Sequence, residues 1–314
     1  MSKPDPPSLI SPEEIRQLLH DDLGLEVDTI VPIRSGAWSS AVGITTRHGD
    51  YVMRFSRTDE DFRRDQFVAR FAGLNLPIPR VLGIGQIDSN WWCLSERVPG
   101  IHLDDLNAAD LAATIPSLAD MLIAMRSVDA SGTLGYGGLD AAGNGRFESF
   151  GDQLLEIAKD VLERREDSRY DTLQQHPQAL ATLERGVETL QHQVQFLSSS
   201  RQLIHMDTLN YNLNVQNNRV SGVYDWGCAM WGDAVYDLAW FAFWEPWYPQ
   251  WQGVHLAESI IDLVGIQGDH ADERLACCKL HIGLDHIRYN AFTRNIGSLE
   301  RVAEATERLL DEIG

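Results

Sequence analysis

The stretch His205-Met206-Asp207-Thr208-Leu209-Asn210-Tyr211-Asn212 and the shorter stretch Tyr224-Asp225-Trp226-Gly227 decide which fold this sequence adopts. Asn212 follows Asp207 by five residues, and Asp225 follows Asn212 by thirteen. The β-prone residues 203–204 precede the first stretch, and the segment between the two predicts a β-hairpin with a turn at 217–218. Both carboxylates are therefore expected in loops that follow short strands.

Phosphoryl transfer needs a set of residues of this kind. One carboxylate must meet the substrate hydroxyl and accept its proton. An amide and a second carboxylate must hold Mg²⁺ on the nucleotide phosphates, because magnesium prefers oxygen ligands. Each residue alone would more often be a turn former, a role in which Asp and Asn are common. The combined spacing is much harder to reach by chance and favours the catalytic interpretation.

The order of predicted elements indicates two lobes in a chain of 314 residues, a length that suits one large domain or two ordinary ones. The first hundred residues predict a helix capped by Ser11, a helix over 60–73, and strands at 29–32, 41–46, 51–55, 80–87 and 91–96. Val98-Pro99-Gly100 marks a boundary. Beyond it, helices are predicted over 111–127, 150–165 and 182–197, then the short β segment, then helices to the end.

The charge balance is strongly acidic, with 46 acidic residues, 26 Lys and Arg, and a formal net charge of −20. A nucleic-acid partner is not expected, because phosphate binding needs a basic footprint. Residues 1–100 hold 14 acids and 11 bases, whereas residues 101–314 hold 32 and 15. Solubility alone explains the total. The uneven division favours a cationic small molecule bound to the second part.

Other features of the sequence indicate a cytoplasmic location. The four cysteines, Cys93, Cys228, Cys277 and Cys278, match neither a disulfide framework nor a zinc site. The N-terminus lacks the long apolar run of a secretory signal. We also expect no segment that spans a membrane, since no run of about 18 apolar residues is evident.

With these motifs in view, the sequence resembles the aminoglycoside phosphotransferases, which have a protein-kinase-like fold, and within them the hygromycin B phosphotransferases. Further matching stretches, spread over most of the chain, are residues 51–54, 76–82, 229–233, 243–247 and 282–285. The resemblance implies an α+β, bilobal fold. Residues 1–97 would form a small nucleotide-binding lobe, and residues 98–314 a larger helical lobe with the catalytic loop and the acceptor site.

The resemblance also implies roles for residues of the two motifs. Asp207 would be the catalytic carboxylate that orients and deprotonates the acceptor hydroxyl. Asn212 and Asp225 would be the magnesium ligands. His205 would support the catalytic loop rather than react, and Asp237 would brace the same loop.

In the small lobe, the resemblance implies nucleotide contacts from three segments: Ser35 and Gly36 in a loop, Val52 and Arg54 on a strand, and Ser95 and Arg97 in the linker. The loop with Gly36 is explained almost equally well as an ordinary hairpin turn. Arg54 stands where the wider superfamily has a phosphate-binding lysine, and arginine holds phosphate as a planar fork. Asp65 is the candidate acidic partner of Arg54, with a surface charge as the alternative.

The acceptor site is expected near the tryptophan-rich segment, where Pro246 and Pro249 interrupt regular helix. Trp240 is expected in the core. Aromatic rings stack on sugars and attract ammonium groups, so the predicted acceptor contacts are Asp207, Trp244, Glu245, Trp247, Asp285 and Tyr289. For each of the polar residues Glu245, Asp285 and Tyr289, a solvated surface role is an equal alternative.

Together, these features predict an ATP- and Mg²⁺-dependent O-phosphotransferase acting on an aminoglycoside, hygromycin B or a relative, and conferring resistance. GTP is not excluded, and the expected state is a monomer or weak dimer. One alternative is a metabolic kinase of the same fold acting on choline, homoserine, a thioribose or a fructosamine. The other is a nucleotide-binding pseudokinase, against which the joint presence of Asp207, Asn212 and Asp225 argues.

Overall fold

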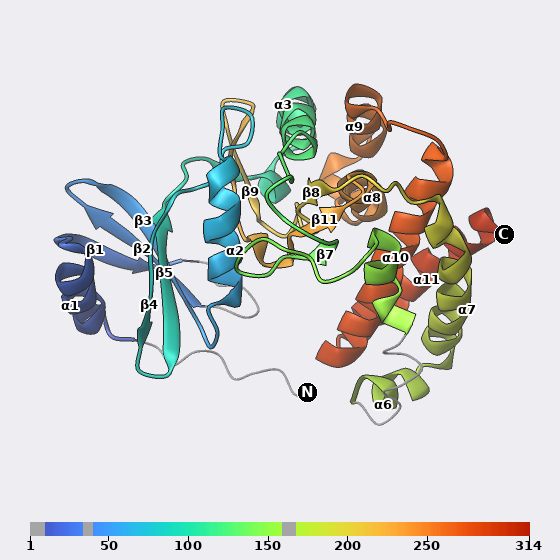
Figure 1. Ribbon diagram of the computed structural model, residues 1–314, viewed down its shortest axis with the longest axis horizontal. Helices are drawn as coiled ribbons and strands as arrows, with labels where there is room; N and C mark the ends of the chain where they lie inside the picture. The colour runs from blue at the N-terminus through green and yellow to red at the C-terminus, as the bar shows by residue number, and fades with distance from the viewer. Residues whose placement is uncertain (1–9, 34–39, 159–167) are drawn as a thin grey trace.

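The computed structural model describes residues 10–33, 40–158 and 168–314 of the chain, and these form two lobes side by side (Figure 1). The small lobe is built on a five-stranded antiparallel sheet in the order β1-β2-β3-β5-β4. Its strands are β1 Val27–Pro32, β2 Ser40–Thr46, β3 Gly49–Ser56, β4 Val81–Ile87 and β5 Asn90–Glu96. The predicted α+β fold is confirmed, and the predicted strands match those observed to within a few residues.

One face of this sheet is covered by helix α1 (Pro12–Leu23). Ser11 caps the helix as predicted, in a reciprocal capping box with Glu14. Along β3, Tyr51, Met53 and Phe55 are buried in the small-lobe core, because successive side chains point to opposite faces. The alternation leaves Val52 and Arg54 on the other face, toward the cleft between the lobes.

Helix α2 (Glu60–Val68) lies between the sheet and the larger lobe (Figure 1). The predicted helix over 60–73 is too long, since the chain tightens into the 3₁₀ turn η1 (Ala69–Phe71). Phe67 and Val68 at the end of α2 pack into the hydrophobic core of the larger lobe, not into that of the small lobe. The packing of α2 therefore joins the two lobes.

The larger lobe is mainly helical. Its helices in the described residues are α3 Ala108–Arg126, α4 Phe150–Leu154, α6 Ser168–Gln174, α7 Pro177–Gln193, α8 Val235–Trp244, α9 Leu256–Val264, α10 Ala271–Thr293 and α11 Ile296–Ile313. The helix predicted over 182–197 begins earlier, because Pro177 fits the first helical turn. Within the range 150–165 predicted as one helix, α4 ends at Leu154, residues 156–158 are again helical, and residues 159–165 lie outside the described residues.

The premise that the chain holds no apolar run of about 18 residues is wrong at α3, whereas the expectation that no segment spans a membrane is not contradicted. By length and composition alone, Ala108–Arg126 is long and apolar enough to cross a membrane. In this structure, Leu111, Leu118 and Met121 of α3 are completely buried, and the helix packs against α9, β8 and β10. The apolar residues of α3 thus form part of the core of the larger lobe.

Two small sheets in the larger lobe position the motif residues. One has the order β10-β9-β6 and the other β7-β11-β8. Their strands are β6 Ile101–His102, β7 Gly137–Gly138, β8 Gln202–Ile204, β9 Leu213–Gln216, β10 Arg219–Val223 and β11 Met230–Gly232. Residues 205–212 connect β8 to β9, and residues 224–229 connect β10 to β11. The predicted turn at Asn217 and Asn218 is present, both with positive φ.

Candidate active site

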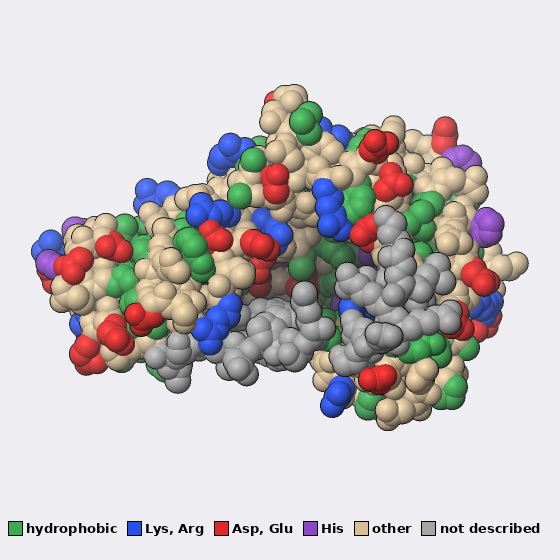
Figure 2. Space-filling model, turned by 60° about the horizontal axis from the view of Figure 1, so that its bottom comes forward, with side chains coloured by type: hydrophobic (Ala, Val, Ile, Leu, Met, Phe, Trp, Pro, Cys, Tyr) green, Lys and Arg blue, Asp and Glu red, His purple; other side chains and the backbone are tan. Residues whose placement is uncertain are grey.

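A cavity of about 460 Å³ lies between the lobes and has the size of a small-molecule site. It corresponds to the hollow between the lobes in Figure 2, whose rim carries acidic and basic side chains. Six of the residues predicted for the nucleotide and the metal line it: Val52, Arg54, Ser95, Arg97, Asn212 and Asp225. Ser35 and Gly36, also predicted for the nucleotide, lie outside the described residues.

Asp207 is held by two asparagine side chains of its own loop. Asn210 Nδ2 donates to Asp207 Oδ1 at 2.6 Å, and Asn212 Nδ2 donates to Oδ2 at 3.1 Å and to the Asp207 carbonyl at 2.8 Å. Burial raises the pKa of Asp207 to about 7, against the hydrogen bond from Asn210. Because the amide nitrogen of Asn212 is engaged, its oxygen is the atom available as a ligand.

Asp225 follows β10 in a left-handed conformation, with φ 64° and ψ 60°. Its side chain is 53% exposed, and Oδ1 lies 3.8 Å from Arg54 Nη1. The loss of solvent between the lobes raises the pKa of Asp225, and Arg54 opposes that shift. The carboxylate therefore faces the cavity beside a fixed positive charge.

Arg54 forms an ion pair with Asp65 of α2, so Asp65 is its acidic partner and not a surface charge. Only 5% of Asp65 is exposed. Burial would lower the pKa of Arg54, but Asp65 and the more distant Asp225 raise it, so the guanidinium stays charged. The other oxygen of Asp65 accepts the backbone N–H of Trp226 at 2.8 Å, next to Asp225.

A second residue of α2 also contacts the larger lobe. Arg64 Nη1 donates to the carbonyl of Gly227 at 3.0 Å, and Arg64 Nε donates to the carbonyl of Leu139 at 2.6 Å. The same Nη1 lies 2.6 Å from Asp61 Oδ1. Helix α2 therefore fixes the backbone on both sides of Trp226.

The loops that carry the three motif residues contain several non-glycine residues in the left-handed region, which is costly for L-residues. These are Met206, Asn210, Tyr211 and Asp225, with φ of 68°, 61°, 69° and 64°. Such backbone persists only when surrounding contacts hold it. Here buried carboxylates from distant segments provide those contacts.

Asp237 and Asp104 hold the two ends of the catalytic loop, as Asp65 holds Trp226. Asp237 on α8 accepts the backbone N–H groups of His205 and Met206 at 3.0 and 2.9 Å, and burial raises its pKa to about 7. Asp104, in η2 (Leu103–Asp105), accepts those of Asn210 and Tyr211 at 3.1 and 2.9 Å. The geometry supports the predicted bracing role of Asp237. Asp104 was missed, because nothing in its sequence spacing connects it to this loop.

His205 is completely buried and joins the two loops of the site. Its Nδ1 accepts the backbone N–H of Asp207 at 3.2 Å, so Nε2 carries the proton and donates to the carbonyl of Tyr224 at 3.1 Å. Burial lowers the pKa of His205 to about 4, so the ring is neutral at pH 7. A neutral ring with both nitrogens engaged supports the predicted structural role.

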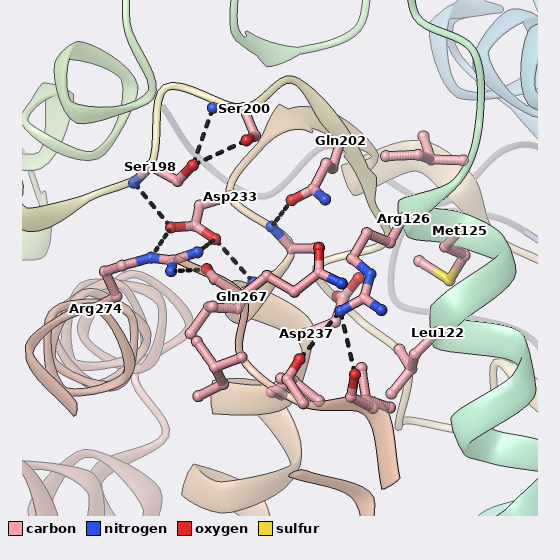
Figure 3. Close-up of a pocket in the computed structure, with 17 residues that line it drawn as sticks. Leu122, Met125, Arg126, Ser198, Ser200, Gln202, Asp233, Asp237, Gln267 and Arg274 are labelled. Carbon is pink, nitrogen blue, oxygen red and sulfur yellow. Dashed lines mark hydrogen bonds and ion pairs between the residues drawn. The ribbon is translucent and has the colours of Figure 1, made fainter. Parts of the chain in front are cut away.

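Behind the catalytic loop lies a second cavity, of about 50 Å³, which is too small for a nucleotide or an aminoglycoside. Figure 3 shows Asp233 at its edge, between Arg274 and Ser198. Both oxygens of Asp233 bind Arg274 at 2.7 Å, and the Ser198 N–H donates at 3.0 Å. This buried pair ties the turn before α8 to α10, and so fixes the element that carries Asp237.

The predicted acceptor residues lie at the end of α8, in the 3₁₀ turn η5 (Glu245–Trp247) and on α10, and they divide into an aromatic group and a polar group. Trp247 stacks on Phe243, with ring centroids 5.5 Å apart, and Trp244 packs edge-on against His286 at 4.6 Å. Tyr289 is 40% exposed. Burial raises the pKa of Tyr289, and the charge of Asp207 contributes to the same shift.

Two of the polar residues predicted as acceptor contacts, Asp285 and Glu245, have different surroundings. Asp285 is partly exposed and lies 3.7 Å from Arg288. Both oxygens of Glu245 accept backbone N–H groups at the start of α9, from Leu256 at 2.8 Å and Ala257 at 3.0 Å. Glu245 therefore caps α9, and this geometry does not support the predicted substrate contact.

Comparison with known proteins agrees with this geometry. A family model described as the phosphotransferase enzyme family matches residues 29–274. The chain is 29% identical over 265 residues to hygromycin-B 4-O-kinase of Escherichia coli, covering 83% of this chain and 74% of that protein.

Solved structures are similar over almost the whole chain. A thermostable mutant of aminoglycoside phosphotransferase APH(4)-Ia, in a ternary complex with AMP-PNP and hygromycin B, superposes with a TM-score of 0.82. It shares 26% identity, and the match covers 95% of this chain and 98% of that one. The GDP complex of aminoglycoside 2′-phosphotransferase-IIIa has a TM-score of 0.65 at 15% identity, over 96% and 98% of the two chains, and supports the fold alone. The chain belongs to the phosphotransferase enzyme family.

Proposed function

We propose that this protein transfers the γ-phosphoryl group of ATP to a hydroxyl of an aminoglycoside, with hygromycin B or a close relative as acceptor. Asn212 and Asp225 line one cleft, and Asp207 is hydrogen-bonded to Asn212; this arrangement is the observation that carries the reaction type. The acceptor class rests on the similarity to hygromycin-B 4-O-kinase and to APH(4)-Ia. Modification of the drug would confer resistance.

In this proposal the nucleotide lies in the cavity between the lobes. Its base would lie against Val52 and the linker with Ser95 and Arg97, and its phosphates would extend toward Arg54. The amide oxygen of Asn212 and the carboxylate of Asp225 face the same cavity, and this oxygen donor set fits Mg²⁺. When bound, the ion neutralises charge on the phosphates.

Asp207 would act on the acceptor hydroxyl, as its proton acceptor. Asn210 and Asn212 hold its two oxygens in one orientation, so the carboxylate side chain would lose little conformational freedom when it binds the hydroxyl. Arg54, held by Asp65, would stabilise negative charge on the transferred group. Positioning and charge neutralisation would thus supply most of the rate enhancement.

The acceptor would bind to the larger lobe, and residues 1–97 and 98–314 would serve as nucleotide and acceptor lobes. Trp244, Trp247 and Tyr289 offer aromatic faces for sugar rings and ammonium groups. Asp285 adds negative charge beside them. The acidic excess after residue 100 would favour a polycationic drug. All four cysteines are free, which fits the cytoplasmic location proposed here.

A coupled ADP-release assay tests this function. The panel is hygromycin B, other aminoglycosides, choline and homoserine, each with Mg²⁺ and either ATP or GTP. We expect turnover with hygromycin B or a relative and background rates with choline and homoserine. Turnover with choline or homoserine alone would identify a metabolic kinase instead, and nucleotide binding without any turnover would identify a pseudokinase.

A further inference from the structure

Three polar side chains on neighbouring strands form a hydrogen-bonded chain on the larger-lobe side of the cleft. His102 lies on β6 and Asn214 on β9, facing each other in the strand pair, and Tyr224 directly follows β10. All three line the 460 Å³ cavity. The proposed phosphoryl transfer uses none of them, although they occupy the part of the cavity next to Asn212.

The donors and acceptors in this series of hydrogen bonds can be assigned one after another, starting from the carbonyl of Val98. The carbonyl of Val98 can only accept, so Asn214 Nδ2 donates to it at 3.2 Å. Asn214 Oδ1 then faces Tyr224, whose hydroxyl donates to it at 2.8 Å. That hydroxyl has one proton, so its 2.9 Å contact with His102 Nδ1 must be donated by His102.

This order assigns the tautomer of His102. In the neutral ring, a proton on Nδ1 leaves Nε2 unprotonated, as a hydrogen-bond acceptor. The hydroxyl of Tyr224 is protonated at neutral pH, as an ordinary phenol is. His102 is only partly buried. An acceptor nitrogen on a partly exposed ring in this cavity suits a ligand that donates a hydrogen bond.

The position of His102 along the cleft indicates which part of a nucleotide it meets. Its ring packs edge-on against Tyr211, with centroids 5.4 Å apart, and Tyr211 precedes the proposed metal ligand Asn212. At the other end, the hydrogen-bonded chain reaches Val98 in the linker, beside the proposed base site. Between phosphates and base a nucleotide has only its ribose, whose hydroxyls are donors.

We propose that His102 Nε2 accepts a hydrogen bond from a ribose hydroxyl of the bound nucleotide, and that Tyr224 and Asn214 hold the ring in the tautomer that permits it. The inference rests on the proposed nucleotide binding. His102 is then a specificity residue that selects ribonucleotides over deoxyribonucleotides. The sequence motifs described above do not include this position.

Calorimetric titration of the full-length protein with ADP, 2′-deoxy-ADP and 3′-deoxy-ADP, each with Mg²⁺, tests the proposal. The wild type should bind one of the two deoxy nucleotides about fivefold more weakly than ADP, the size of one neutral hydrogen bond. His102→Ala should weaken ADP binding by a similar factor and bind that deoxy nucleotide as the wild type does. Such non-additivity is the signature of a direct contact.

Two further variants complete the experiment. Tyr224→Phe keeps the ring but removes the hydroxyl, so it should reduce the discrimination between ADP and the deoxy nucleotide. His192→Ala changes an exposed histidine on α7 and should bind all three nucleotides as the wild type does.

Equal weakening of all three nucleotides by His102→Ala, or no discrimination by the wild type, would overturn the proposal. The titrations contain no aminoglycoside, so an error in the proposed acceptor leaves their result unaffected. A complete lack of ADP binding would reject the proposed function together with this inference.

Discussion

The nucleotide end and the acceptor end of the site are built in different ways. At the nucleotide end, Asp65, Asp104 and Asp237 each hold strained backbone next to a motif residue. At the acceptor end, Trp244 and Trp247 pack among other aromatic rings, and the polar residues Asp285 and Tyr289 lie on α10. Directional hydrogen bonds therefore fix the backbone at the nucleotide end, whereas the packing of aromatic rings shapes the surface at the acceptor end. Substitutions should therefore affect rate or nucleotide binding at one end and acceptor affinity at the other.

The largest expected effect is that of Asp207→Asn, which removes the proton acceptor and keeps a side chain of similar shape. We expect kcat to fall about 1000-fold, within the usual range for general-base catalysis. ADP release under saturating substrates measures the loss, and an unchanged thermal unfolding midpoint is the control. Residual activity above a tenth of the wild type would reject the assigned role.

Asp225→Ala should act on the nucleotide rather than on the acceptor. Loss of one proposed magnesium ligand is expected to raise the KM for the Mg²⁺-nucleotide about 100-fold, with a smaller change in acceptor KM. Steady-state kinetics over a range of Mg²⁺ concentrations give both values. An unchanged dependence on Mg²⁺ would show that Asp225 is not a ligand.

His205→Gln should change how stability depends on pH. Burial lowers the pKa of His205 to about 4 from a usual value of 6.5, so the unfolded chain binds a proton that the folded chain does not. The stability associated with the neutral ring is present above pH 6.5 and is lost as pH falls toward 4, by at most about 3 kcal/mol. Urea unfolding at several pH values should show a weaker loss in the variant than in the wild type. A parallel loss in both would contradict the assignment.

At the acceptor end, Trp247→Ala should raise the acceptor KM about tenfold and leave the nucleotide KM unchanged. The expected cause is lost stacking and cation–π attraction to the drug, which is typically 1–2 kcal/mol in partly desolvated sites. Varying each substrate in turn separates the two constants. An equal rise in both would indicate that the substitution disturbs the fold near α8 instead.

The smallest kinetic effect should come from Glu245→Gln. Because both oxygens of Glu245 cap α9, the acceptor KM should change less than about twofold, while loss of a helix cap lowers the free energy of unfolding by about 1 kcal/mol. Chemical denaturation of the variant measures the free energy of unfolding, and steady-state kinetics on the same protein measure the acceptor KM. A tenfold rise in acceptor KM would instead support the substrate contact that was predicted for Glu245 from the sequence.

The sequence separation between contacting residues explains which parts of the site could be predicted from the sequence. The catalytic loop and Asp225 are encoded by short spacings, and Asp237 and His205 lie close to them along the chain. Asp104 lies about one hundred residues before the loop that it holds, and only the folded chain brings the two together. Glu245 caps α9, so predicting this role requires the position at which α9 begins. The sequence before α9 shows no helical periodicity that would reveal it. The strands of the small lobe were predictable because they are short β-prone segments, and along β3 the alternation of apolar residues reports the two faces of the sheet.

Helix α2 also determines which part of the small lobe can move. Phe67 and Val68 lie in the core of the larger lobe, and Arg64 and Asp65 bind the backbone at Gly227 and Trp226. If the cleft opens to release product, we therefore expect the sheet with α1 to move relative to α2, which is bound to the larger lobe. The ion pair between Arg54 on the sheet and Asp65 on α2 crosses that boundary, so such a movement would have to break it.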